Sequence, residues 1–409
     1  MSAYVTYNGI PNGSSLILGS GQYTFGSAAS AQAVTVNIPD TLDVTANPEI
    51  VMDNGVIQVN GYGDPIGNHR TINRLAGRSP NFTAIAHKTY FGAIPDLKIA
   101  LSPIKDFDIQ IKSNVPDAKI ELYFKDKLIN PDSLGNYSGT YGAYNIVASK
   151  TGYRCFRGDF NIADNASGVQ VFDVNLEYAP DAWDGVALTE PALVDSVYQI
   201  ASGAELAWFA NYVNGGGKVT DAVLIKDIDL GNFQWTPIGA NLKPTGGVFS
   251  GSQYTGYFDG NMHNITGLYI SQPTYSYQAL FGYIKEATIS RVAVSGYVHG
   301  KQNVGGLVGS MTQGGVIDRC VNNATVKSYT TWCGGIVGNM ANAATKVTNC
   351  YNTGDVTGTT SCGGVVGMNN KDAVVENVYN VGVVTGTTVG ACVGGTTTKE
   401  KVKNAFSIY

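Results

Sequence analysis

The side chains best placed for acid–base chemistry form two pairs in the middle of the chain. Asp227 and Asp229 are separated by one residue, and Asp259 lies four residues before His263. Paired carboxylates hydrolyse glycosidic bonds in many enzymes, and Asp227 with Asp229 could instead hold calcium. A structural explanation is simpler, because alternate strand residues point outward and Asp-Gly forms turns. We therefore expect no enzyme, no cofactor and no metal site, and keep a polysaccharide-active β-helix enzyme as an alternative.

Aromatic side chains offer a second kind of chemistry, the binding of sugars or proteins. Tyr275, Tyr277, Tyr329 and Trp332 fall at expected turns, where side chains often point outward, so they are the candidate ligand contacts. Packing against the neighbouring turn is an equally good explanation for each. The remaining tryptophans, which we interpret as core residues around a helix, are Trp183, Trp208 and Trp235.

The elements that carry these residues repeat along the last third of the chain. A glycine-rich pentad recurs after 29, 29 and 27 residues, and a second short β-rich segment follows each copy. Repeats of this length stack as a solenoid, and two β-rich segments per repeat favour a β-solenoid over helical repeats. The four copies of the pentad are 305–309, 334–338, 363–367 and a decayed 390–394.

Equivalent residues of in-register coils lie above one another at a spacing of about 4.8 Å. Asn322, Asn352 and Asn380 occupy equivalent positions, so they should form an amide ladder that stabilises the stack. An aromatic stack is expected beside this ladder, formed by Tyr351, Tyr379 and Phe406.

One helix is predicted just before the first coil. Ser202 and Glu205 have the spacing of a capping box, and Leu206, Phe209 and Val213 fall on one helical face. An amphipathic helix at this point would cover the open end of the stack, which is otherwise an edge that invites aggregation.

Residues 181–409 resemble the GLUG-motif β-solenoid module of bacterial surface proteins. The resemblance depends on Trp183-Asp184-Gly185, the helix around 204–210, Trp235-Thr236-Pro237-Ile238-Gly239 and the repeated pentads. It implies a right-handed parallel β-solenoid at the cell surface. It does not imply catalysis, because the His-Glu-x-x-His zinc motif of the immunoglobulin A peptidases that carry such modules is absent here.

Two further β-domains are expected ahead of the solenoid. Alternating strands and turn clusters in residues 106–180 predict a β-sandwich spacer, which resembles PEGA-type and other transthyretin-like or Ig-like modules. Residues 1–105 contain strand-like segments and no chemical motif, so we interpret them as a β-rich attachment or assembly domain through which the chain could form a homo-oligomer.

The cysteines fall into two equivalent pairs and two single residues. Cys320 with Cys350, and Cys333 with Cys362, lie one coil apart, so each pair should be separated by about 4.8 Å between Cα atoms. This distance permits a disulfide, although parallel side chains give poor torsion geometry. We favour stacked free thiols that act as small core residues. The cysteines without an equivalent partner are Cys155 and Cys392.

Composition and charge limit the possible partners. Only 14% of residues are charged, and a net charge of −5 gives no reason to expect nucleic-acid binding. No apolar run is long enough to span a membrane. We expect an extracellular display or adhesion protein that binds a glycan or a host-surface protein. No secretion signal is visible at Met1, so a phage virion protein, such as a tail fibre or head decoration, is the main alternative.

Overall fold

The computed structural model describes residues 107–408 apart from 125, 140–141, 164–165, 218–220, 242–248, 343, 371–372 and 397–400, together with seven short strands before residue 107. The chain forms two compact units. The first contains Met1–Gln110, Pro131–Ala143 and Asn161–Val171, and the second contains Ile111–Asn130, Tyr144–Phe160 and Phe172–Tyr409.

Seven strands are described in the predicted N-terminal domain of residues 1–105. They form a three-stranded sheet β1-β3-β6 and the pairs β2-β4 and β5-β7. The remainder of this predicted domain lies outside the described residues. The strands are β1 Tyr4–Tyr7, β2 Ser14–Ile17, β3 Gln22–Ala28, β4 Val34–Asn37, β5 Phe82–Ala84, β6 Ile94–Ile99 and β7 Leu101–Pro103.

Two sheets occupy the segment where the sandwich was expected. Their orders are β10-β9-β12-β13 and β11-β8-β14. Three aromatic rings of the second unit stack in series, with centroids 5.0 Å apart between Tyr144 and Phe160 and 3.4 Å apart between Phe160 and Phe172. The strands are β8 Phe107–Ser113, β9 Lys119–Phe124, β10 Lys127–Ile129, β11 Tyr137–Gly139, β12 Gly142–Ser149, β13 Phe156–Ile162 and β14 Gln170–Val174.

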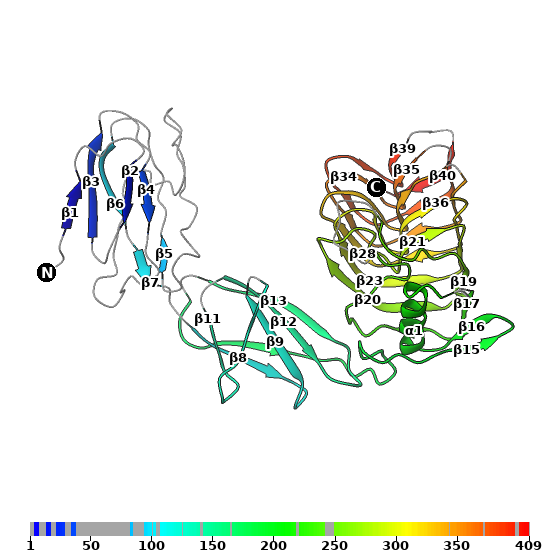
Figure 1. Cartoon of the computed structure of the whole chain (residues 1–409), viewed down its shortest axis with the longest axis horizontal. Helices are drawn as coiled ribbons and strands as arrows, with labels where there is room; N and C mark the ends of the chain where they lie inside the picture. The colour runs from blue at the N-terminus through cyan, green and yellow to red at the C-terminus, as the bar shows by residue number, and fades with distance from the viewer. Residues whose placement is uncertain are drawn as a thin grey trace. The chain divides into compact units, whose positions relative to one another are not determined.

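The solenoid makes about seven turns over residues 198–407 and confirms the predicted fold, with strands stacked coil upon coil (Figure 1). Its coils contribute strands to three sheets. The 17-stranded sheet contains β15 Ala192–Val194, β16 Val197–Ile200, β17 Ala222–Leu224, β18 Ile228–Asp229, β19 Tyr257–Asp259, β20 Asn264–Gln272, β22 Thr288–Ser290, β23 Ala293–Gly300, β26 Val316–Asp318, β27 Val321–Asn322, β28 Thr325–Ser328, β31 Lys346–Thr348, β32 Tyr351–Asn352, β33 Val356–Thr357, β36 Val374–Asn380, β37 Val384–Thr385 and β40 Val402–Ser407. The five-stranded sheet contains β21 Phe281–Lys285, β25 Val308–Thr312, β30 Val337–Met340, β35 Val366–Asn369 and β39 Val393–Thr396. The four-stranded sheet contains β24 Val304–Gly305, β29 Thr331–Gly334, β34 Thr360–Gly363 and β38 Val389–Gly390.

Each glycine pentad turns a corner between two sheets. In the first copy, β24 ends at Gly305 and β25 begins at Val308, so the chain changes direction between them. Leu307 and Val308 are therefore both fully buried, although neighbours within one flat strand would point to opposite faces. The corner explains why every pentad carries two adjacent apolar residues.

The predicted helix is α1, Gly203–Asn214, which connects the parallel strands β16 and β17 within the first coil. The Ser202 hydroxyl accepts from the Glu205 amide, as in a capping box, whereas the Glu205 carboxylate accepts from the amide of Ala201, one residue before the N-cap. Leu206, Phe209 and Val213 are buried, as the pattern predicts, and join the core of the stack. The edge of β16 is covered by the antiparallel strand β15.

Candidate functional site

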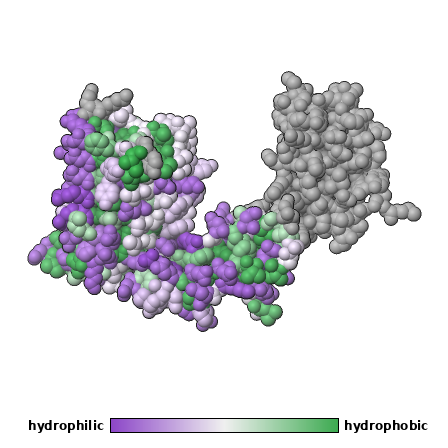
Figure 2. Space-filling model, turned by 180° about the vertical axis from the view of Figure 1, so that it is seen from behind, coloured by the Kyte–Doolittle hydropathy of each residue, from purple (hydrophilic) through white to green (hydrophobic). Residues whose placement is uncertain are grey.

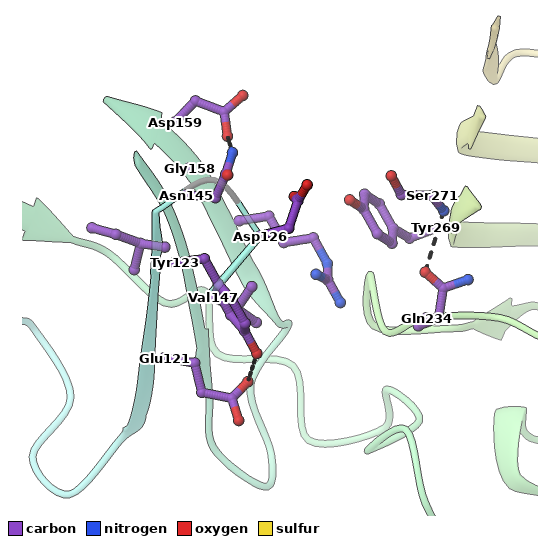
Figure 3. A pocket seen from close by; sticks show the side chains of 12 residues that line it. Glu121, Tyr123, Asp126, Asn145, Val147, Gly158, Asp159, Gln234, Tyr269 and Ser271 are labelled. Carbon is purple, nitrogen blue, oxygen red and sulfur yellow. Dashed lines mark hydrogen bonds between the residues drawn. The ribbon is translucent and has the colours of Figure 1, made fainter. Parts of the chain in front are cut away.

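A cleft of about 530 Å³ lies within the second unit and is lined by polar and aromatic side chains. One wall comes from strands β9, β12 and β13, and the other from β20 and from Gln234 in the segment between β18 and β19. Figure 3 shows Tyr269, Ser271 and Gln234 on one side of this cleft, opposite Asn145 and the other labelled side chains of the first wall.

Strand alternation directs the side chains of the first wall into the cleft. On β12, Tyr144 and Ile146 are buried, whereas Asn145 and Val147 point to the opposite face and line the cleft. On β9, the buried Leu122 lies between Glu121 and Tyr123, whose side chains line the cleft in the same way. The polar side chains of this wall are Glu121, Tyr123, Asn145, Arg157 and Asp159, together with Asp126 from the turn after β9.

Arg157 joins the two walls. Its guanidinium carbon lies 4.0 Å from the ring centroid of Tyr269, and its Nε donates to the carbonyl oxygen of Asn232 at 3.2 Å. Tyr269 also stacks on Tyr297 of the next coil, with centroids 5.7 Å apart. The ring and the Nε donor thus fix the Arg157 head group, and the rest of the guanidinium fork can serve a ligand.

A second set of contacts anchors the residues just before β13 to the solenoid at the end of β18. The Cys155 amide donates to the carbonyl oxygen of Gly231 at 2.8 Å, and Arg154 Nη2 lies 2.9 Å from Asp229 Oδ2. Asp229 Oδ1 meanwhile accepts from the amide of Gly231 at 2.9 Å. These contacts join the segment before β13 to the segment after β18, so they hold the two walls of the cleft at a fixed separation.

Negatively charged side chains outnumber positively charged ones in the lining of the cleft. Three carboxylates line it against the guanidinium of Arg157, and Lys119 Nζ lies 2.6 Å from Glu121 Oε1, so a weakly negative potential is expected there. Asn145 donates to Asp159 Oδ1 at 2.6 Å, and the Tyr123 hydroxyl donates to Glu121 Oε2 at 3.4 Å (Figure 3). Burial raises the pKa of Tyr123 and the charge of Glu121 raises it further, so this hydroxyl keeps its proton at neutral pH.

The four aromatic residues proposed from sequence as ligand contacts lie outside this cleft. Tyr329 is 69% exposed, whereas Tyr275 and Trp332 are half-buried. Tyr277 is only 6% exposed, so its assignment as a ligand contact is wrong. Its ring packs against Phe249 and Tyr283 because the turn carrying it folds back onto the neighbouring coil.

The candidate carboxylates have structural partners. Asp227 Oδ1 accepts from the Asn264 amide at 2.8 Å and lies 3.1 Å from His263 Nδ1, while Asp259 pairs with Arg291. Hydrogen bonds from the Asn264 amide and then from His263 lower the pKa of Asp227. Among the residues that the structure describes, no group of three or more His, Cys, Asp or Glu side chains could hold a metal ion.

The ladder asparagines lie on successive coils and are buried. Asn322 Nδ2 donates to Asn352 Oδ1 at 2.7 Å, and Asn352 Nδ2 donates to Asn380 Oδ1 at 2.8 Å. Each amide also donates to a carbonyl oxygen two residues further along its own chain segment. Both N–H groups of Asn322 and of Asn352 are therefore used inside the solenoid, and the buried ladder stabilises the stack.

Comparisons with known proteins leave the function open. No family model matches the chain, and no curated protein matches it. Among solved structures, the chain is similar to a Bacteroides ovatus protein provisionally described as an immunoglobulin A1 protease, with 20% identity, coverage of 54% of this chain and 78% of that chain, and a TM-score of 0.38. A likeness this distant carries no argument about activity.

The residues of the cleft were not found from the sequence. They come from strands of unrelated sequence that are separated by more than a hundred residues, so no motif or period connects them. One signal was present: Tyr269 and Tyr297 are 28 residues apart, which is close to the length of one coil. That spacing marks an aromatic pair on successive coils, where a solenoid presents side chains side by side.

Proposed function

We propose that this chain is a non-enzymatic binding protein of the cell exterior, and that the cleft around Arg157 recognises a neutral glycan. The observation that carries the proposal is the Arg157 head group, held against Tyr269 and surrounded by carboxylate and amide groups. Sugar hydroxyls both donate and accept, so they can satisfy a site that mixes carboxylates, amides and a guanidinium. The excess of carboxylates disfavours uronic acids and sialylated glycans.

Several features support a binding role over turnover. The polar groups of the cleft hold one another through hydrogen bonds, so their geometry is set before a ligand arrives, which reduces the cost of binding.

The cell-surface location is supported by the resemblance of residues 181–409 to GLUG-type modules. Within the described residues, no helix has the length and apolarity needed to cross a bilayer. Much of the solenoid surface seen in Figure 2 is hydrophilic or neutral.

The test is a screen of the full chain against immobilised neutral, acidic and amino-sugar glycans. The proposal predicts binding to a subset of neutral glycans, weak dependence on salt, and no binding to uronate polymers. Binding confined to acidic glycans, or to none, would contradict it.

The enzyme alternative is tested on the same glycans by measuring release of reducing ends. We expect none from the wild-type protein. Glycan cleavage that disappears in Asp227→Asn and Asp259→Asn would show that the chain is an enzyme and that the binding proposal is wrong.

A further inference from the structure

Two pairs of cysteines lie on successive coils in the same part of the solenoid, and the two pairs differ in how their sulfur atoms point. Cys333 and Cys362 are register partners on β29 and β34, and Cys320 and Cys350 directly precede the paired residues of β27 and β32. All four are buried and are free thiols in this structure. The pairs therefore share their spacing and burial, which makes one a natural control for the other.

In the first pair the sulfur atoms face each other. Cys333 Sγ lies 2.7 Å from Cys362 Sγ, which is closer than the roughly 3.5–4.0 Å at which non-bonded carbon atoms pack. A disulfide bond requires a separation of about 2.05 Å, so only a small movement is needed to form one. A side chain at Gly358 would meet both sulfur atoms, at 2.6 and 2.8 Å, so glycine there leaves room for the pair.

In the second pair the sulfur atoms have other partners. Cys320 Sγ donates to the carbonyl oxygen of Asp318 at 3.4 Å, and Cys350 Sγ donates to that of Thr348 at 3.1 Å. Cys350 Sγ also accepts from the backbone amide of Cys320 at 3.4 Å, so this pair is held by backbone partners, unlike the Cys333 and Cys362 sulfur atoms, which contact each other directly. Forming a bond between them would require both side chains to rotate and both hydrogen bonds to break.

We propose that Cys333 and Cys362 form a disulfide that ties two successive coils together under oxidising conditions, whereas Cys320 and Cys350 remain thiols. One cysteine thiolate attacks glutathione disulfide, forming a mixed disulfide and releasing one glutathione. The second cysteine thiolate then attacks the mixed disulfide and releases the second glutathione. The protein loses two protons and two electrons, and the oxidant gains both electrons as it is reduced to two thiols.

The hydrogen bond between the two thiols favours this chemistry. The thiol of Cys333 donates to Cys362, which lowers the pKa of Cys362, and the same bond together with burial raises the pKa of Cys333. Cys362 is therefore the more available thiolate of the pair, and the thiolate is the attacking species. The inference does not depend on the glycan proposal, since the cleft contains neither cysteine.

The experiment refolds the reduced full chain in a glutathione redox buffer, so that burial in the folded state does not bar the oxidant. Free thiols are then alkylated in denaturant, and the protein is digested with trypsin. Cleavage at Arg319, Lys327, Lys346 and Lys371 gives three peptides: 320–327 with Cys320, 328–346 with Cys333, and 347–371 with Cys350 and Cys362.

The proposal predicts that alkylation falls from six thiols to four and that peptide 328–346 is linked to peptide 347–371. The link should survive in Cys350→Ala and disappear in Cys362→Ala. The oxidised wild-type protein should melt roughly 5 °C or more above the oxidised Cys362→Ala variant, because the bond closes a long loop in the unfolded chain. Six alkylated thiols, or a link between peptides 320–327 and 347–371, would overturn the proposal.

Discussion

Single asparagine residues on the outer face of the solenoid form a second amide ladder that was not predicted. Asn404 Nδ2 donates to Asn377 Oδ1 at 2.9 Å, and Asn377 Nδ2 donates to Asn349 Oδ1 at 3.1 Å. These three residues adopt left-handed backbone angles, with φ of 47°, 55° and 54°, which asparagine tolerates better than most residues. At the other end, Asn349 donates to the carboxylate of Asp318 at 2.8 Å.

We predict that ionised Asp318 stabilises the solenoid and that this stabilisation is lost at low pH. Burial alone would raise its pKa, but hydrogen bonds from Asn349, Arg319 and Thr348 outweigh burial and lower it. A lowered folded-state pKa contributes stability that is present above the unfolded value of about 3.9 and is lost as the pH falls through the folded value. Asp318→Asn should cost about 1 kcal/mol of unfolding free energy at pH 7, and the difference should narrow below pH 4. Melting curves of both proteins from pH 7 to pH 2.5 measure this, and a difference independent of pH would contradict it.

At the scale of the coil, the second glycine of each pentad and the ladder asparagine form a matched pair. A Cβ at Gly335 would lie 2.3 Å from Cγ of Asn352, and the same clash occurs between Gly306 and Asn322 and between Gly364 and Asn380. The last coil has Ala391 in the glycine position and the smaller Ser407 in the asparagine position. Among the four pentads, the second position therefore carries a Cβ only in the last one, where serine replaces the ladder asparagine.

This pairing predicts coupling between the two positions. Gly335→Ala should destabilise the solenoid by about 1–3 kcal/mol through overpacking against Asn352 and against the carbonyl oxygen of Gly364, which would lie 2.2 Å from the new Cβ. Asn352→Ser alone should also destabilise it, because the ladder loses its central amide. The double variant should be less destabilised than the sum of the two, as measured by a double-mutant cycle in denaturant. Simple additivity would show that the two positions do not interact.

The contrast between the solenoid and the cleft shows what a single sequence can provide. The pentads and Asn322, Asn352 and Asn380 recur at a fixed period, and in-register stacking converts that period directly into contacts. Arg157 and Tyr269 share no period, because the first belongs to β13 and the second to β20. The contact between them depends on how β13 packs against the solenoid, and no local sequence pattern predicts that packing.

At the scale of the whole molecule, the stack ends in strands that, among the described residues, have a partner on one side only. β38, β39 and β40 are each the last strand of their sheet, and the hollow beside them, of about 330 Å³, is lined by Val393, Val402 and Ala405. Phe406 in this coil is 63% exposed. The final coil should therefore open more readily than the middle of the stack.

Hydrogen exchange of the full chain tests whether the final coil opens more readily than the middle of the stack. We expect the amides of β39 to exchange at least tenfold faster than those of β30, since Val337 is fully buried and Val393 is not. Equal protection of β30 and β39 would show that the end of the stack is covered in solution.

The central claim is that the cleft binds a glycan, and calorimetric titration with a neutral glycan selected by the screen tests it most directly. Arg157→Ala and Tyr269→Ala should each weaken binding at least tenfold, because the first removes the fixed donor and the second removes the ring that orients it. Tyr329→Ala, which removes an exposed aromatic ring outside the cleft, should bind like the wild-type protein. Unchanged affinity in both cleft variants, with their melting temperatures preserved, would contradict the account.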